Sequence, residues 1–383
     1  MKKLNNEAGS SMDIGGSAQA FLPFPLPPKK CLSMDGRVLV LLSEADLALG
    51  RLDGLSEMID EKDLFVMMYI KKEAVWSSQI EGTQASLIDV LEFEGEALRP
   101  DSPRDIGEVV NYIAAMQLGL KRIKEGSRID LSLIKDLHRK LMRDSRGGDL
   151  DPGEFRNVQN WVGPPGCSIS DAVFVPPPPR EMMISLKNLE TFMNDNTDLP
   201  PLIRASLAHY QFETIHPFLD GNGRMGRLLI LLILLRDGHL KNPLLYISHF
   251  FRMQRSIYYE KLQNVRERGE WEGWIGFFLK GVKEVSEEAS KRSLYILSLV
   301  KEHREIILGK LGRNGPRAVI LLNAMMRRPV LDVNGIREIT GLSYQNANRM
   351  ASQLEDLGIL VEVTGQRRNR IFEYKEYLDT LEK

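Results

Sequence analysis

The stretch from Glu213 to Leu235, ETIHPFLDGNGRMGRLLILLILL, constrains the fold more than any other part of the chain. Its second half is almost entirely apolar, and the most hydrophobic run, Leu228 to Leu235, is eight residues long. A bilayer crossing needs about 20 apolar residues, so we expect this run to be a helix buried in a protein core. The glycines ahead of it predict a bend where that helix begins.

Most of the chain carries the apolar spacing of helices. From Ala45 to about Gly312, apolar residues recur every three or four positions, and the exception is a β-like insertion around residues 158–175. With 383 residues, of which 43% are hydrophobic and 27% charged, the chain has a globular composition and room for two or three domains. The sequence therefore predicts a mainly α fold.

Composition divides the chain into four parts. Residues 1–37 are rich in Gly, Ser, Asn and Pro, which favours an extended N-terminal arm over a packed element, with the ordered part beginning near Val38. A helical N-terminal region, 38–105, and a larger helical domain, 106–312, are expected to follow. The stretch that comes next, up to Tyr374, has nine arginines, no lysine and six acidic residues. Its net charge of about +3 marks a separate small domain over 313–383.

Charge, cysteines and the first residues exclude several classes of protein. The formal net charge is −1, which argues against a chain that mainly coats nucleic acid. Cys31 and Cys167 lie far apart with no metal-ligand spacing, which is typical of a reducing compartment. The first residues lack the apolar stretch of a signal peptide. We expect a cytoplasmic protein with no membrane partner.

The bend ahead of the apolar helix has the composition of an anion site. Gly221 and Gly223 allow backbone angles closed to other residues, so residues 220–223 can form a concave turn with converging N–H groups. The free amides and the positive dipole end of the following helix add to this site. Arg224 and Arg227, three residues apart in its first turn, supply permanently charged donors that match phosphate oxygens.

Two further side chains extend this bend beyond anion binding. Asp220 is a hard oxygen ligand suited to hold Mg²⁺ against bound phosphates. His216, four positions earlier, could accept a proton from an attacking hydroxyl near neutral pH. Each residue alone also fits a structural role, such as a histidine at the end of a helix over 205–215. The combination within one loop favours a site for a phosphate-bearing group.

The stretch resembles the signature of the Fic family, H-x-F-x-[DE]-G-N-G-R-x-x-R. It matches at every specified position, namely His216, Phe218, Asp220, Gly221, Asn222, Gly223, Arg224 and Arg227. The resemblance implies a mainly helical Fic fold that moves a nucleotide monophosphate, usually AMP from ATP, onto a protein hydroxyl. ATP would be the substrate, Mg²⁺ the cofactor, and a target protein with a Ser, Thr or Tyr hydroxyl the partner. The resemblance leaves open whether the chain also modifies itself and whether it forms a homodimer.

The resemblance also implies a role for each of these residues. His216 would be the general base, Asp220 the Mg²⁺ ligand and residues 221–223 the anion hole. Arg224 would hold the nucleotide phosphates, and Arg227 the γ-phosphate. The domain over 106–312 would accordingly be the Fic catalytic domain.

Several alternatives to AMP transfer stay open. In the related Doc-like kinases a lysine stands at the position of Gly223 and the nucleotide binds reversed, so Gly223 favours AMP transfer over phosphorylation. With the same loop, the chain could remove AMP, or transfer another nucleotide or a phosphocholine group. It could also be a DNA-binding transcriptional regulator whose Fic portion only senses nucleotide.

Two stretches outside the motif are candidate contacts for the target and the base. A hairpin is expected where residues 159–162 and 172–175 flank Gly-Pro-Pro-Gly. By resemblance this is the Fic flap, whose exposed edge could hold a target segment by main-chain pairing.

Tyr258 and Tyr259 follow the motif on a helical stretch, where the resemblance places residues near the adenine. Paired tyrosines on a helix are more often core, so adenine contact and packing both stay open.

Upstream of the motif, the sequence predicts a helix end that carries an acidic residue. Residues 63–80 are expected to be helical, Gly82 to close the helix, and Ser86 with Asp89 to cap the next one. Glu81 therefore lies at a helix C-terminus, where its carboxylate meets the negative end of the dipole. A nearby cation would compensate this unfavourable contact, although most glutamates at helix ends are simply solvated.

This helix end is similar to the inhibitory pattern [ST]-x-x-x-E-[GN] of Fic proteins, matched by Ser77, Glu81 and Gly82. The pattern is short, and it gains weight because a full Fic motif follows it. The resemblance implies that Glu81 pairs with Arg227, occupies the γ-phosphate position and keeps ATP from binding productively.

The last domain is expected to be a winged helix. The expected elements are helices over 317–326, 333–340 and 343–357, then strands over 359–363 and 371–374. In the third helix, a core stripe leaves four polar positions outside, which are Tyr344, Gln345, Asn348 and Arg349. The segment between the two strands, which would be the wing, carries Arg367, Arg368 and Arg370, and these could contact phosphates. DNA binding through residues 313–383 and docking onto a protein both stay open.

Overall fold

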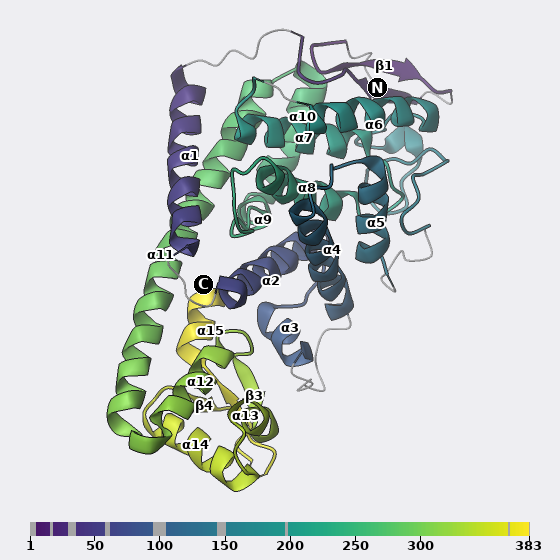
Figure 1. Cartoon of the computed structure of the whole chain (residues 1–383). Helices are drawn as coiled ribbons and strands as arrows, with labels where there is room; N and C mark the ends of the chain where they lie inside the picture. Colours follow the sequence, from purple (N-terminus) through teal and green to yellow (C-terminus); the bar gives the residue numbers. More distant parts are fainter. Residues whose placement is uncertain are drawn as a thin grey trace.

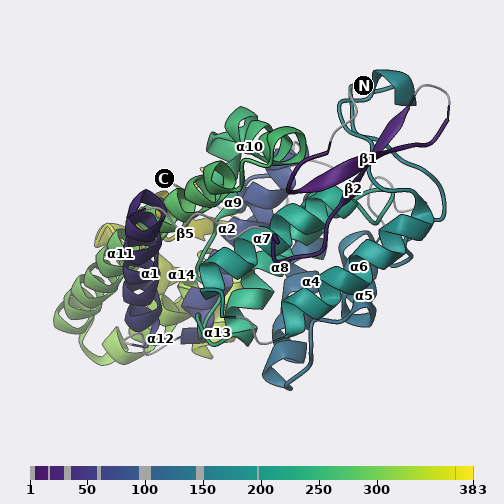
Figure 2. The same cartoon turned by 90° about the horizontal axis from the view of Figure 1, so that it is seen from above.

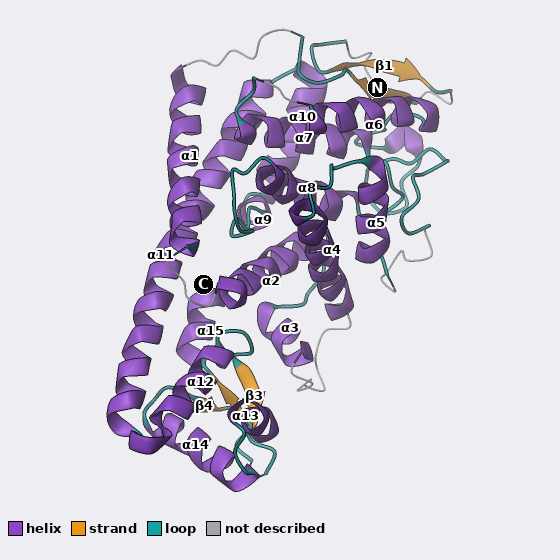
Figure 3. Cartoon of the chain, in the orientation of Figure 1, coloured by secondary structure: helices purple, strands orange, loops and turns teal. Residues whose placement is uncertain are grey.

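The computed structural model describes residues 5–15, 18–29, 36–57, 62–94, 105–143, 151–195, 198–366 and 368–382 of the chain. Helices dominate this part of the chain, and strands lie only near its two ends (Figure 3). The mainly α fold predicted from the sequence is confirmed.

The helices before the central motif are α1 (Gly36–Ser56), α2 (Lys62–Ile80), α3 (Leu87–Glu94), α4 (Ile106–Lys124), α5 (Leu131–Leu141) and α6 (Pro179–Asn194). Those that carry and follow it are α7 (Pro201–Ile215), α8 (Asn222–Arg236), α9 (Ser248–Met253), α10 (Arg255–Arg268) and α11 (Trp271–Lys310). The last ones are α12 (Gly315–Met325), α13 (Val333–Thr340), α14 (Tyr344–Asp356) and α15 (Lys375–Glu382).

Helix α8 is the centre of the core. It packs against α7, α4, α2 and α5, and Figure 2 shows it among these helices. Residues 228–234 are all buried, as a helix that is apolar all round requires. The contact with α4 is especially close, because Gly119 of α4 leaves room for the Leu232 side chain of α8. The predicted buried helix is therefore confirmed.

Helix α11 joins the central helices to the end of the chain. It is 40 residues long, which corresponds to about 60 Å. Helix α1 packs along it, and the group of elements from α12 to α15 lies at its far end, away from the first strands (Figure 1). We call residues 315–382 the C-terminal unit. His303 Nδ1 and Tyr374 Oη lie 2.9 Å apart and tie α11 to this unit.

The C-terminal unit has three helices, a small sheet and a final helix. Helices α12, α13 and α14 agree with the predicted helices to within two residues at each end. The sheet has the antiparallel order β3-β5-β4, with bounds β3 (Val330–Asp332), β4 (Val361–Glu362) and β5 (Ile371–Glu373). Strand β3 and helix α15 were not expected from the sequence, and β4 is shorter than expected. Winged helix stays a prediction for this unit.

The polar residues proposed for DNA contact differ in their exposure and in the contacts they already make. Tyr344, Gln345 and Arg349 are exposed on α14, and Asn348 is partly buried. Arg370 is occupied within the unit, since its Nη2 donates to Glu355 Oε2 at 2.6 Å and its guanidinium covers the Phe372 ring. Arg368 is exposed, and Arg367 lies outside the described residues.

The N-terminal stretch is packed against the core, and the expectation of an extended arm with order beginning near Val38 is wrong. Strand β1 (Gly9–Asp13) pairs antiparallel with β2 (Gln19–Pro23). Phe21 is 4% exposed, and its N–H donates to Val175 O at 2.9 Å. Gln211 Nε2 of α7 donates to Phe24 O at 2.9 Å. The small and polar residues of this stretch give no local signal of a hairpin, and its partners Val175 and Gln211 lie more than 150 residues away in the sequence.

The hairpin predicted for the flap is reduced to a single bridge. Val162 pairs with Phe174, with N–H···O distances of 2.8 and 3.0 Å, and Ile169–Asp171 form a short 3₁₀ helix between them. The prolines on both sides have no N–H to donate, which limits further pairing. Phe174 is buried and anchors the flap, while Val162 is exposed.

Among the described residues, no helix combines the length and the hydropathy that a bilayer crossing requires.

Replacing Phe21 by Ala should lower the free energy of unfolding by about 3 kcal/mol, because it removes a buried aromatic side chain. Phe24, which is 38% exposed, is the matched control, and Phe24→Ala should cost under about 1 kcal/mol. Urea denaturation measures both. Equal, small effects would contradict a packed N-terminal hairpin.

Candidate active site

The candidate site lies where α7 ends and α8 begins. His216 caps α7 with the left-handed backbone angles φ 49° and ψ 60°, and its N–H still donates to Phe212 O at 3.0 Å. This conformation is uncommon for a residue other than glycine. Arg156, which is 3% exposed, holds it by donating from Nε to His216 O at 2.9 Å. The histidine is therefore fixed by a buried arginine distant in the sequence.

The loop between the two helices is closed by a side chain of the motif. Asn222 Oδ1 accepts the Phe218 N–H at 2.9 Å, and Asn222 Nδ2 donates to Phe218 O at 2.8 Å. Asn160 of the flap adds a third bond to Phe218 O at 3.0 Å. Gly221 has φ 76°, which a residue without a Cβ adopts freely. The loop is thus rigid, with the first turn of α8 directly behind it.

The side chain of His138, in α5, packs against the loop and hydrogen-bonds to it. Its ring stacks on Phe218 with centroids 3.6 Å apart, and its Nδ1 accepts the Gly153 N–H at 2.9 Å. Nε2 therefore carries the proton and donates to Asp220 O at 3.0 Å. Burial lowers the pKa of His138 to about 4, so this tautomer is kept at neutral pH.

An ion pair joins the first turns of α8 to the end of α2. Arg227 is 1% exposed, and its Nη2 donates to Glu81 Oε1 at 2.7 Å. Its Nε donates to Ser77 Oγ at 2.8 Å, and Nη2 also donates to Ser77 O at 2.9 Å. Burial raises the pKa of Glu81, but the charge and hydrogen bond of Arg227 outweigh this and hold that pKa below its ordinary value.

The Glu81 carboxylate lies directly over the first turn of α8. A Cβ built on Gly223 would be 2.3 Å from Glu81 Oε1 and 2.9 Å from Arg227 Nη1. Only a residue without a side chain lets the carboxylate approach so closely. Free amides and the positive dipole end attract an anion to this position, and the glutamate supplies one. Glu81 itself remains 34% exposed.

The two motif arginines have different partners. Arg224 is 3% exposed and turns toward α4 and α5, where Nη1 lies 3.4 Å from Glu108 Oε2 and Nη2 lies 3.4 Å from Met142 Sδ. Its Nε is buried with no acceptor among the described residues. Arg224 and Arg227 thus flank the first turn of α8 from separate sides.

His216 is neutral at physiological pH. Burial lowers its pKa to about 4, and the positive charges of Arg266 and Arg156 add to this effect. A neutral imidazole has a lone pair that can accept a proton. The environment of this histidine therefore fits a base, which is the role that the motif implies.

Two carboxyl groups are buried around Arg227 and are partly protonated near neutral pH. Burial raises the pKa of Glu213 to about 7, opposed by the charge of Arg227. Burial also raises the pKa of Glu73 to about 7, although Ser248 donates to it from both N and Oγ. Glu81, with its lowered pKa, is therefore the main counter-charge of Arg227.

The metal assignment rests on Asp220 alone. Its side chain is exposed, and Oδ1 accepts the Gly221 N–H at 2.6 Å. No three His, Cys, Asp or Glu side chains gather into a metal site in the described part of the chain. A single carboxylate fits Mg²⁺ that is otherwise held by substrate phosphates and water.

The two candidate adenine contacts differ in exposure. Tyr258 is fully buried, and its hydroxyl lies 2.9 Å from His209 Nε2, so its surroundings are those of a core residue. Tyr259 is 42% exposed. Desolvation and then the charge of Glu81 raise the pKa of the Tyr259 hydroxyl to about 12. Tyr259 is the better candidate for a base contact.

Sequence reasoning missed three residues that hold the loop, namely Arg156, Asn160 and His138. None belongs to a local pattern, because each acts through backbone atoms of the loop 58 to 82 residues away. A polar residue on an otherwise apolar helix face, as His138 is on α5, is the one signal that the sequence offered.

Comparisons with known families agree with the geometry. Residues 39–121 match the family model described as Fic/DOC family N-terminal, and residues 128–234 match the one described as Fic/DOC family. A crystal structure of a Fic family protein from Desulfovibrio desulfuricans G20 has a TM-score of 0.57 at 19% identity. The match covers 89% of this chain and 97% of that one and shows a shared fold.

Two curated relatives from flies are similar to about half of the chain. Protein adenylyltransferase Fic of Drosophila grimshawi is 32% identical over 197 residues, which are 49% of this chain and 36% of that protein. The protein of the same name from Drosophila willistoni is 30% identical over 225 residues, which are 56% of this chain and 40% of that protein. The aligned part thus spans well under two thirds of these relatives.

Replacing Glu213 by Gln should change how stability depends on pH. The unfolded carboxyl ionises near pH 4.5 and the folded one near pH 7, so the wild type loses stability as pH rises between these values. Relative to the wild type, the variant should gain about 2 kcal/mol between pH 5 and pH 7. Urea denaturation at both pH values measures this difference, with the exposed Glu267→Gln as the control. Parallel pH curves for Glu213→Gln and the wild type would contradict a buried, protonated Glu213.

Proposed function

The chain belongs to the Fic/DOC family, and from that premise we propose that it is a protein adenylyltransferase restrained by Glu81. It moves AMP from ATP onto a Ser, Thr or Tyr hydroxyl of a target protein. The similarity to curated proteins named protein adenylyltransferase Fic supports this activity.

One observation carries the regulatory part of the proposal. The Glu81 carboxylate lies over Gly223 and is hydrogen-bonded to Arg227, at an anion site formed by the start of α8. A carboxylate oxygen there stands in for a phosphate oxygen. ATP in the productive orientation would need the same position for its γ-phosphate, so the two anions exclude each other.

The reaction follows from the groups around the loop. His216 accepts the proton of the target hydroxyl, and the hydroxyl oxygen attacks the α-phosphorus of ATP. The bond from that phosphorus to the bridging oxygen breaks, and pyrophosphate leaves. The loop amides and Arg224 stabilise the charge on the phosphate oxygens. Gly223 leaves room for the α-phosphate beside His216.

Magnesium fits this scheme through Asp220, the exposed carboxylate at the start of the loop. A bound Mg²⁺ would neutralise charge on the phosphates of the donor. The chain itself fixes Asp220 in place, since its carbonyl accepts from His138 and its carboxylate from the Gly221 N–H.

Replacing Glu81 by Gly should raise ATP-dependent labelling of a target, or of the chain itself, by at least about ten-fold, because it frees Arg227 and the anion site. The variant would be incubated in a cell lysate with each labelled nucleoside triphosphate in turn. ATP should be the preferred donor. His216→Ala added to this variant is the control and should abolish labelling. Labelling at the wild-type level by every donor would contradict the proposal.

The pH profile of the Glu81→Gly variant should report the base. The lowered pKa of His216, about 4, keeps the imidazole neutral at higher pH. We therefore expect kcat/KM to be level from about pH 8 to pH 5 and to fall as pH drops through about 4. Circular dichroism at each pH separates this loss from unfolding. A decline centred between pH 6 and pH 7 would argue against a neutral His216 as the base.

A further inference from the structure

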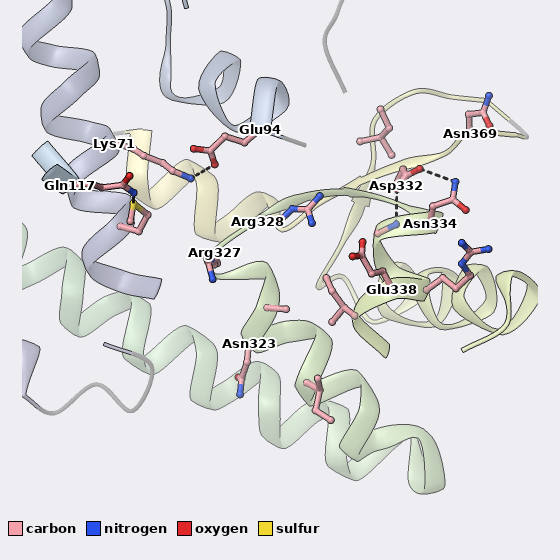
Figure 4. A pocket seen from close by; sticks show the side chains of 17 residues that line it. Lys71, Glu94, Gln117, Asn323, Arg327, Arg328, Asp332, Asn334, Glu338 and Asn369 are labelled. Atoms are coloured by element: carbon pink, nitrogen blue, oxygen red, sulfur yellow. Dashed lines mark hydrogen bonds and ion pairs between the residues drawn. The ribbon is translucent and has the colours of Figure 1, made fainter. Parts of the chain in front are cut away.

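A large cavity lies between the N-terminal helices and the C-terminal unit. Its volume is about 1360 Å³, and one wall comes from α2, α3 and α4 while the other comes from the end of α12 and the start of α13 (Figure 4). No residue of the loop over 216–227 lines it. The cavity is therefore separate from the proposed active site, and its size is ample for a small organic ligand.

Two adjacent arginines in this cavity have no ionic partner among the described residues. Arg327 is exposed at the end of α12, and Arg328 is partly buried beside it. Figure 4 shows the Arg328 guanidinium between the Lys71–Glu94 pair and Asp332. Arg328 Nε is buried, and no described atom accepts a hydrogen bond from it. A buried donor without an acceptor is unfavourable, so this position calls for an anion or a polar ligand.

The acidic groups of the cavity are engaged elsewhere or exposed. Glu94 Oε2 lies 2.5 Å from Lys71 Nζ. Asp332 caps α13, because its Oδ1 accepts the Gly335 N–H at 2.7 Å, and its Oδ2 lies 3.2 Å from Asn334 Nδ2. Glu338 is exposed. The lining carries four basic side chains, Lys71, Arg327, Arg328 and Arg337, against these three acidic ones, and neither Arg327 nor Arg328 forms an ion pair with a described residue.

We propose that this cavity binds a phosphate-bearing small molecule through Arg327 and Arg328. Guanidinium groups match phosphate oxygens with paired N–H donors and keep their charge at every physiological pH. The side-chain amides of Gln117, Asn323 and Asn369 also line the cavity, as do apolar residues such as Ile320. This mixture suits an organic body attached to the phosphate. The proposal is independent of the proposed AMP transfer.

Calorimetric titration of the full chain with inorganic pyrophosphate, and in parallel with ribose 5-phosphate, tests this site. Replacing Arg327 and Arg328 together by Gln should weaken binding by about ten-fold or more, because two charge-assisted contacts are lost. Arg327→Gln alone should weaken it in the same direction, and its exposed position leaves the core intact. Thermal unfolding of each variant verifies the fold.

Two control variants locate the binding event. Arg349→Gln changes an exposed arginine of α14 outside the cavity and should leave the affinity unchanged. Arg224→Gln changes the proposed active site and should leave one pyrophosphate site intact. Ribose 5-phosphate should follow the same dependence on Arg327 and Arg328. Absence of binding at about 10 mM ligand, or binding lost in Arg224→Gln and kept in the double variant, would overturn the proposal.

Discussion

The buried Arg227 is the constraint on which the arrangement of the site depends. A guanidinium that is 1% exposed would be strongly unfavourable without partners, because desolvation of a charge amounts to several kcal/mol. Ser77 and Glu81 supply those partners from about 150 residues upstream. Any anion that replaces Glu81 must therefore neutralise the same charge at the same place. A polyphosphate satisfies this requirement, whereas water alone would leave the guanidinium poorly compensated.

The loop beside Arg227 is rigid because its backbone is bonded from several sides. Asn222 closes it from within, while Arg156 and His138 hold His216 O and Asp220 O from other elements. Hydrogen bonds to the backbone fix a loop without using the side chains that meet a substrate. Preformed donors need little reorganisation when charge develops on a phosphate. The left-handed backbone at His216 is tolerated for the same reason, since its surroundings determine it completely.

The sequence predicted what is encoded locally and missed what depends on distant partners. The central helix, the loop glycines and the Ser86–Asp89 cap follow from short patterns, and the cap is present with Asp89 N donating to Ser86 Oγ at 3.2 Å. Strand β3 is three residues long and leaves no periodic signal. The N-terminal hairpin is stabilised by contacts with Val175 and Gln211 that no local pattern reveals. The pairing of Glu81 with Arg227 came from the family resemblance, since spacing alone does not join residues so far apart.

Helix α2 links the Glu81–Arg227 pair to the rest of the molecule through buried polar groups. Tyr69 Oη lies 3.0 Å from Ser293 Oγ of α11, Lys71 pairs with Glu94, and Glu73 accepts from Ser248. Moving α2 would break all of these buried contacts together, and each broken one is costly. Glu81 lies one residue beyond the end of α2 and is partly exposed, so rotation of its side chain breaks the hydrogen bond to Arg227 and leaves the contacts of α2 intact. A local rotation of the Glu81 side chain would therefore uncover the start of α8, while α2 stays in place and keeps Ser77 on Arg227.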